Sequence, residues 1–462
     1  MRAKFTSLFL VLFLGYSSCL LGQSYGWTKT LSGTPVSNSR AMTMDTDNNE
    51  DIVIGGRFYG EVDFDPGPLS TTYSAPNFYN PFIAKYDPQG NLIWASRFTG
   101  TSRGEVNDLV CDSIGNIYAI GQFSGTYEFS GGVVEVSFSS SSPNFHDIFI
   151  LKLDPNGQVV WVFPIHTPIF DHTPHISLDA QGNVYVAGAY YLPTDFDPGP
   201  GQYIQSSIGS RDVFVAKYTP NGDFVWAETG GGNLHSWVND LAVTKDGTVY
   251  AAVYNMQGAT YGPYSLSWNG MIKLDSSGQY LWVKPFGGLA DNESKIVLND
   301  QEDIFIGGLF YSSGDFDPGP NSHILLPYDS NPDGYICKWD SSANLDWVKQ
   351  FTGPGKFRCT GIDLDLGGRI VLAGDFTDVI DFNPDSAASF SLLAQFRDAF
   401  HMRLTSSGDF DWANQITGIG EQKVWGMQVT PTNHLLSAGF FNDSTDFDPS
   451  VGHDWGQNRW NH

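Results

Sequence analysis

Cysteine is scarce in this chain of 462 residues, which contains only four. Cys19 lies near the N-terminus, and Cys111, Cys337 and Cys359 are spread over the rest of the sequence. So sparse a set does not predict a disulfide framework, even in an oxidising compartment. The last three each lie in a predicted strand, where we expect small buried hydrophobic residues.

Long apolar runs are missing as well. Leu8–Leu14 is far shorter than the roughly 20 residues that a membrane-spanning helix needs, and no later segment reaches that length. Arg2 and Lys4 precede this run and small residues follow it, a pattern that predicts a secretory signal peptide over residues 1–22. We therefore expect residues 23–462 to be secreted or exposed at the extracellular surface, without a transmembrane segment.

Positive charge is the third scarcity. The chain has 24 Lys and Arg against 50 Asp and Glu, and its formal net charge of −26 would become −28 without the signal peptide. So acidic a surface repels phosphate backbones, which argues against nucleic acid as a partner. It is compatible with calcium or with basic proteins. The sequence contains no His-Glu-x-x-His motif.

What the sequence has in abundance is a repeated strand–turn–strand unit. In Asp147–Trp161, alternating apolar residues flank an Asp-Pro-Asn-Gly turn, which is the signature of an antiparallel hairpin. Lys152 precedes Trp161 by nine residues, and we expect this cation to lie across the Trp or to pair with a loop Asp. The same spacing recurs at Lys85/Trp94, Lys217/Trp226, Lys273/Trp282, Lys338/Trp347 and Arg403/Trp412.

A second hairpin, such as Ile176–Gly188, lies between consecutive units. Each repeat of about 65 residues therefore provides four antiparallel strands. A sheet of this kind is exposed on both faces and must pack against neighbours, as propeller blades do. With Trp27 counted as a seventh Trp, the sequence predicts an all-β fold: a seven-bladed β-propeller of four-stranded antiparallel blades.

The two ends of the chain bear on how the ring closes. Trp27 lies in an isolated strand, Gly26–Gly33, which would form the outer strand of the last blade and close the ring. The last blade supplies its first two strands over Met427–Phe441, and no third strand follows before His462. We therefore expect the last blade to be incomplete and the C-terminal end of the chain to be truncated.

Three of the repeated stretches resemble a known family. Trp94–Gly100, Ile114–Gly121 and Asp212–Lys217 are similar to the SBBP-type β-propeller repeats of secreted bacterial proteins. The resemblance covers residues 26–448 and is specific for architecture. It implies a seven-bladed propeller on an exported or surface protein, with no shared catalytic residues.

An acidic motif recurs in the long loops between second and third strands. Asp63-Phe-Asp-Pro-Gly-Pro68 has paired carboxylates that could bind calcium, although calcium needs six to eight oxygen ligands. In the structural alternative, which its recurrence favours, Pro-Gly forms a type II turn, Asp bonds its own backbone and Phe fills the gap between blades. The candidate calcium ligands are Asp63, Asp65, Asp195, Asp197, Asp315, Asp317, Asp446 and Asp448.

One loop motif, His166–His175, does not repeat. It connects a fourth strand to the next first strand on the long-loop face. Asp171, His172 and His175 could converge on a transition metal; the alternative is a polar exposed loop.

Two functions stay open. We favour an exported, non-catalytic binding or scaffold module at the cell surface, a monomer that takes a protein or glycan ligand on its long-loop face. The alternative is a polysaccharide-active hydrolase or lyase with acidic residues on that face, since propellers host such chemistry. An enzyme should have one blade with unusual, non-repeating polar residues that converge on the channel, and a binding module should show acidic residues spread around the rim.

Overall fold

The computed structural model describes residues 6–14, 24–34, 36–129, 136–142, 145–169, 173–287, 294–442, 444–448 and 455–456. Every regular element in these ranges is a β-strand, which confirms the all-β prediction. Because the described ranges hold no helix, none of them supplies an apolar helix long enough to cross a membrane.

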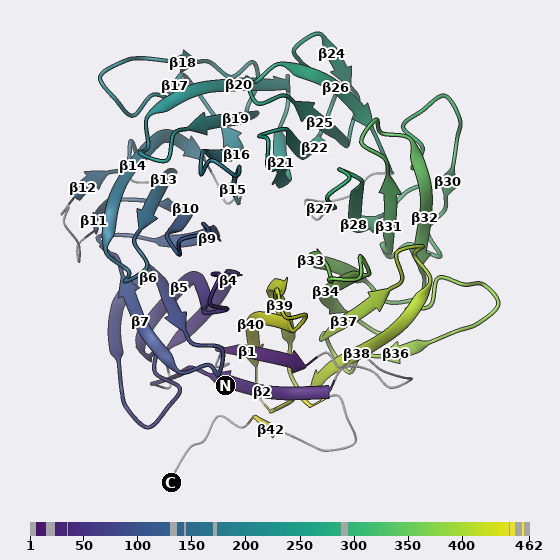
Figure 1. Ribbon diagram of the computed structural model, residues 1–462, viewed down its shortest axis with the longest axis horizontal. Coiled ribbons are helices and arrows are strands. Elements are labelled where there is room, and N and C mark those ends of the chain that lie inside the picture. The colour runs from purple at the N-terminus through teal and green to yellow at the C-terminus, as the bar shows by residue number, and fades with distance from the viewer. Residues whose placement is uncertain are drawn as a thin grey trace.

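Most strands belong to four-stranded antiparallel sets that surround a common centre (Figure 1). The first strand of each set is innermost and the fourth is outermost. The sets formed by successive strands are β4 (Asn38–Thr46), β5 (Ile52–Asp63), β6 (Thr72–Tyr86) and β7 (Leu92–Arg97); β9 (Gly104–Cys111), β10 (Ile117–Phe123), β13 (His146–Leu153) and β14 (Val159–Ile169); β15 (His175–Leu178), β16 (Val184–Tyr190), β19 (Asp212–Tyr218) and β20 (Phe224–Gly232); β21 (Ser236–Val243), β22 (Val249–Asn255), β25 (Gly270–Leu274) and β26 (Tyr280–Pro285); β27 (Lys295–Leu298), β28 (Ile304–Phe310), β31 (Asp333–Trp339) and β32 (Leu345–Phe351); and β33 (Phe357–Leu364), β34 (Ile370–Phe376), β37 (Asp398–Leu404) and β38 (Phe410–Gly418).

Short strands lie in the long connections and toward the periphery (Figure 1). They are β3 (Ser32–Gly33), β8 (Thr99–Gly100), β11 (Thr126–Phe129), β12 (Val136–Ser139), β17 (Thr194–Asp195), β18 (Ile204–Gln205), β23 (Ala259–Tyr261), β24 (Tyr264–Leu266), β29 (Gly314–Asp315), β30 (Ile324–Leu325), β35 (Val379–Asp381), β36 (Ser391–Leu393), β41 (Thr445–Asp446) and β42 (Trp455–Gly456).

One further set combines the two ends of the chain. β39 (Gln422–Val429) pairs with β40 (Leu435–Asn442), β40 with β1 (Thr6–Leu14), and β1 with β2 (Ser24–Thr30), all antiparallel. Trp27 thus lies in the fourth strand of this set, as predicted. The expectation that its third strand is missing differs from the structure, because the apolar run near the N-terminus takes that place and its backbone completes the ladders of β40 and β2.

The core lies between neighbouring sets. β10, β16, β28 and β34 are buried along their whole length, because second strands have a neighbouring sheet on each face. Cys337 and Cys359 are buried, as expected, and burial raises the pKa of the Cys337 thiol. Cys111 is only half-buried.

Neighbouring sets are joined at the tight turns between third and fourth strands. Trp94 Nε1 donates to the carbonyl of Pro155, 3.1 Å away in the turn of the next set. Trp161 and Trp226 make the same contact with Pro220 and Ser276. The ring of Trp94 also lies against Gly157, where a Cβ would come within 2.8 Å of it.

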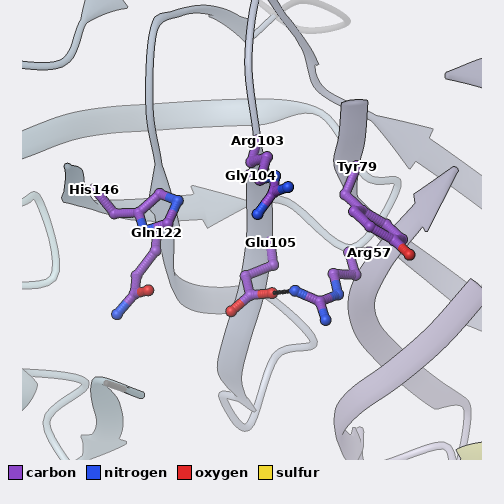
Figure 2. Close-up of a pocket in the computed structure, with 7 residues that line it drawn as sticks. All are labelled: Arg57, Tyr79, Arg103, Gly104, Glu105, Gln122 and His146. Atoms are coloured by element: carbon purple, nitrogen blue, oxygen red, sulfur yellow. Dashed lines mark hydrogen bonds and ion pairs between the residues drawn. The ribbon is translucent and has the colours of Figure 1, made fainter. Parts of the chain in front are cut away.

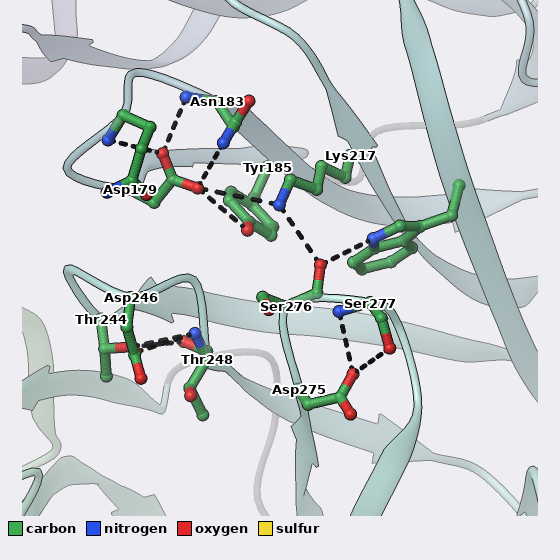
Figure 3. Close-up of polar contacts among 12 residues, drawn as sticks. Asp179, Asn183, Tyr185, Lys217, Thr244, Asp246, Thr248, Asp275, Ser276 and Ser277 are labelled. Atoms are coloured by element: carbon green, nitrogen blue, oxygen red, sulfur yellow. Dashed lines mark hydrogen bonds and ion pairs between the residues drawn. The ribbon is translucent and has the colours of Figure 1, made fainter.

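The fixed cation takes part in this contact. Lys217 Nζ lies 3.2 Å from the same Ser276 carbonyl and 3.8 Å from Asp179 (Figure 3). Its ammonium also lies 4.8 Å from the ring centre of Tyr185 in the second strand. Pairing with a loop carboxylate is therefore confirmed here. The aromatic partner of Lys217 is Tyr185 of the second strand rather than the predicted Trp226, although both lie opposite it. At Arg403 the predicted partner is confirmed, because its guanidinium lies 5.5 Å from the ring centre of Trp412.

We expect Gly157→Ala to destabilise the fold more than Gly368→Ala. Both glycines have positive φ, 79° and 69°, so both substitutions impose backbone strain of about 1–2 kcal/mol. A Cβ at residue 157 meets the Trp94 ring, whereas one at residue 368 meets nothing within 4 Å. The crowding should add about 1–3 kcal/mol to the loss at residue 157. Urea unfolding measures both losses; equal losses would contradict close packing of the Trp on the turn.

Candidate functional site

A cavity of about 320 Å³ lies among the innermost strands at the centre of the arrangement. Residues of β4, β9, β15, β21, β27, β33 and β39 line it. The cavity is therefore built by first strands, whose side chains vary from set to set while the second strands behind them are mainly apolar.

One register position on the first strands supplies a row of polar groups. Thr43, Asp108, His175, Asp240 and Lys295 lie opposite equivalent residues of their second strands, and we call them the axial row. Thr43 Oγ1 lies 3.1 Å from Asp108 Oδ1, and His175 Nδ1 lies 3.6 Å from Asp108 and 3.5 Å from Asp240. Lys295 Nζ lies 3.4 Å from Asp240, so an alternation of acids and bases follows the cavity wall. The equivalent positions on β33 and β39 are Gly361 and Gly426.

The carboxylates of the axial row also hold neighbouring strands. Asp108 Oδ2 accepts from the backbone N–H of Ile176 at 3.1 Å, and Asp240 Oδ2 from that of Ile296 at 2.8 Å. Burial lowers the pKa of Lys295, but the carboxylates of Asp240 and Asp108 more than offset this and the pKa is raised. Lys295 therefore stays protonated beside Asp240.

Three buried polar atoms of residues that line the cavity have no hydrogen-bond partner in the described part of the chain. β9 and β21 each carry a bulge that takes one residue, Asn107 or Asn239, out of the ladder. Both amide groups line the cavity, and the buried Oδ1 of each lacks a hydrogen bond among the described residues. The same holds for Nε2 of His175. Buried polar atoms are normally satisfied, so three unsatisfied ones in one cavity indicate a place for a ligand or water.

The predicted transition-metal residues are placed only in part. His175 lies in the axial row, 5% exposed, while Asp171 and His172 fall outside the described residues. Within the described part of the chain, no three His, Cys, Asp or Glu side chains are arranged to hold a metal ion. The metal site stays a prediction.

The carboxylates of the Asp-Phe-Asp loops bond their own backbone. Asp63 Oδ1 accepts from the N–H groups of Asp65 and Thr71, and Asp65 Oδ1 from that of Gly67 at 2.7 Å. The Phe64 side chain is fully buried. Both features were expected of the structural alternative, and they recur at Asp195, Asp197 and Phe196, and at Asp315, Asp317 and Phe316. Asp446 likewise accepts from the N–H of Asp448, and Phe447 is buried.

The type II turn expected in these loops is wrong. It needs positive φ at its glycine, and Gly67 does not have it. A Cβ at Gly67 would lie 2.9 Å from Asp65 Oδ1, so the glycine is there to let the carboxylate approach. Calcium binding at these loops stays a prediction.

A second, smaller cavity of about 40 Å³ lies beside the axial one, toward the long loops. Arg57 forms an ion pair with Glu105 on its wall, and Tyr79, Arg103 and His146 complete the lining (Figure 2). The guanidinium of Arg57 lies over the Tyr79 ring at 4.7 Å.

Sequence reasoning missed Asp108, Asp240 and Lys295. Their signal is visible only when the first strands are aligned, because these residues share one position with His175 while the flanking apolar residues repeat. Non-repeating polar residues do converge on the centre, but they come from several sets of strands and not from the single one expected of an enzyme.

Comparisons with known proteins give limited similarity. No protein-family description matches the chain. It is 21% identical over 493 residues to an uncharacterized WD repeat-containing protein, L264, of Acanthamoeba polyphaga mimivirus, across 88% of this chain and 35% of that protein. The chain thus spans about a third of the length of this relative. The resemblance to SBBP-type repeats stays a prediction.

Two solved structures are similar at a low level. One is a protein of unknown function from Bacteroides caccae, with 9% identity and a TM-score of 0.34 over 72% of this chain and 89% of that chain. The other is a europium-containing methanol dehydrogenase, with 11% identity and a TM-score of 0.36 over 89% and 93%. Scores this low carry no argument about function.

Two carboxylates near the axial row should make stability depend on pH. Burial raises the pKa of Asp45 and of Asp363 from 3.8 to about 6, although backbone N–H groups of neighbouring first strands donate to both. The folded state then binds more protons than the unfolded state between these values, so the free energy of unfolding should fall as pH rises from 3.8 to about 6 and level off above.

The double variant Asp45→Asn/Asp363→Asn lacks both titrations. Chemical unfolding from pH 4 to pH 7 measures the wild-type free energy minus that of the variant. We expect this difference to decrease with rising pH; a constant difference would show that the pKa values are not raised.

Proposed function

We propose that the chain is a seven-bladed β-propeller whose ring is closed by β1 and β2. First strands that share one register with their second strands support this count. So does Trp27, whose ring lies against the turn glycine Gly90 as that of Trp94 lies against Gly157. Similarity to a WD repeat protein adds support, because WD repeats build four-stranded propeller blades.

We infer that this propeller is a binding module whose ligand enters the axial cavity from the long-loop face. The observation that carries this function is the set of unsatisfied buried atoms on Asn107, Asn239 and His175. The side chains that recur across the repeats, such as the Lys and Trp of the outer strands, make contacts between sheets. The residues of the axial row and of the bulges differ from blade to blade. The cavity lies within the range of about 300–1,000 Å³ typical of ligand sites.

The test is a glycan and protein binding screen of the whole chain, repeated with two matched variants. Asn239→Leu replaces an unsatisfied amide in the cavity with an apolar group of similar size. Asn221→Leu makes the same change on an exposed tight turn at the opposite end. We expect binding to weaken by about tenfold or more in the first variant, the equivalent of a lost hydrogen bond of about 1.4 kcal/mol, and to persist in the second. Equal binding by both would contradict a ligand in the cavity.

An enzymatic alternative draws on the same cavity. His175 between the carboxylates of Asp108 and Asp240 could exchange a proton with a sugar, as a hydrolase or lyase requires. The glycans of the screen are therefore also checked for new reducing ends. Their appearance with the wild type and not with Asp240→Asn would favour the enzyme.

We propose further that the protein is exported to the cell surface as an SBBP-type module. Removal of residues 1–22 as a signal peptide is the alternative to closure of the ring by β1, which lies within those residues. Cleavage would take β1 away from β40 and β2 and leave two unpaired strand edges. Mass spectrometry of the protein secreted by an expressing cell should give a chain that begins near residue 23. A mass that retains residues 1–22 would contradict the signal peptide and favour β1 as a permanent strand.

A further inference from the structure

A second register layer lies between the axial row and the long loops. It consists of residues three positions before the axial-row position on five first strands, each with its partner on the second strand, and we call it the mouth layer. Its pairs are Arg40/Arg57, Glu105/Gln122, Trp237/Tyr254, Arg358/Asp375, and Lys423/Phe440, with equivalent registers throughout.

Cations outnumber acids in the mouth layer, in contrast to the whole chain. Arg57 is paired with Glu105, and Arg358 Nη1 lies 3.6 Å from Asp375, which Arg397 also approaches at 3.7 Å. Glu105 is thus occupied by one cation, and Asp375 is shared between two.

Arg40 has no acid partner of its own. No carboxylate of the described residues lies within ion-pair distance of its guanidinium, and its buried Nε has no hydrogen-bond partner there. The guanidinium lies 5.5 Å from the ring centre of Trp425 and 5.1 Å from that of Phe440, and Lys423 Nζ lies 5.4 Å from the ring centre of Phe440. Burial, and then the charge of Arg57, lower the pKa of Arg40.

A half-buried guanidinium without an ion-pair partner, and with further cations beside it, lowers the stability of the fold unless an anion binds to it. The chain has 50 acidic residues, and none of the described ones forms an ion pair with Arg40. Arg358 and Trp425 line the axial cavity, so an anion held at the mouth layer would lie at its entrance.

We propose that the mouth layer binds the anionic group of an acidic sugar, a carboxylate or a sulfate ester, whose ring enters the axial cavity beside Trp425. This inference rests on the proposed binding function and names its ligand class.

The size and the charge of the site favour a single acidic sugar over an extended polyanion. A volume of about 320 Å³ lies at the lower end of ligand cavities and suits one compact unit. A nucleic acid or an acidic protein would extend beyond the cavity over a surface whose net charge is −26, where it is repelled. The half-buried Trp425 offers an apolar face to a sugar ring while the cations hold its anionic group.

The experiment titrates the full chain with a uronate disaccharide, a sulfated disaccharide, the neutral disaccharide of the same linkage and a short glutamate-rich peptide, by calorimetry. Arg40→Met removes the charge and keeps an apolar side chain over Trp425. Lys245→Met is the matched control, because Lys245 is exposed on a tight turn at the other end and forms an ion pair with the exposed Asp300. Thermal unfolding verifies that each variant is folded.

We expect either acidic disaccharide to bind, the neutral one to bind at least about tenfold more weakly, and Arg40→Met to remove this preference while Lys245→Met keeps it. The comparison of uronate and sulfate identifies the anionic group. Equal binding of acidic and neutral sugars, or tighter binding of the peptide, would overturn the acidic-sugar inference and leave the proposed binding function standing. Arg40→Met without effect would overturn it too. If no ligand binds in a way that Asn239→Leu weakens, both the inference and the proposed function fail.

Discussion

The structure depends on a contact between sheets. A four-stranded sheet of these sequences has two apolar faces, and neither is covered until a neighbour packs against it. The contact that fixes the neighbour is small and directional: an indole N–H and an ammonium converge on one turn carbonyl, as Trp226 and Lys217 do on Ser276. The indole ring lies on the turn residue with positive φ, which is a glycine in turns such as that of Gly157, whereas Ala343 holds the equivalent position between β31 and β32. The fixed spacing of Lys and Trp in the sequence is a consequence of this geometry.

Because the outer strands carry that contact, the inner strands are free to differ. The bulges on β9 and β21 illustrate the result: each takes an Asn that lines the axial cavity out of the ladder, while the second strand behind it is mainly buried and apolar. Polar groups that would be costly in a core are tolerated there because the cavity admits a ligand or water. The contacts between sheets and the lining of the cavity are thus provided by different strands of the same sheet.

The sequence predicted what repeats and missed what does not. Strand pairs, tight turns, Trp27 as an outer strand and the burial of Phe64 follow from alternation and spacing, which are local properties. The role of residues 6–14 as a strand could not follow, since an apolar run of that length fits a signal peptide and a buried strand equally well. The axial row was invisible for another reason: Asp108 and Asp240 meet His175 only after separate repeats are brought together, and the bulges shift the alternation by one residue.

Acidic and basic side chains lie at different distances from the centre of the molecule. The carboxylates of the Asp-Phe-Asp loops belong to connections such as those of β17, β18, β29 and β30 near the periphery, and they are held by their own backbone N–H groups (Figure 1). The cations of the mouth layer lie on inner strands, where solubility does not require them. At physiological ionic strength the field of exposed charges decays over about 8 Å, whereas partly buried groups are screened much less. The acidic periphery therefore keeps long polyanions away, while a small anion that passes it meets mainly Arg40 and its neighbours. The net charge of the chain describes the repulsion of long polyanions, but it gives no indication of the cations that a small anion meets at the centre.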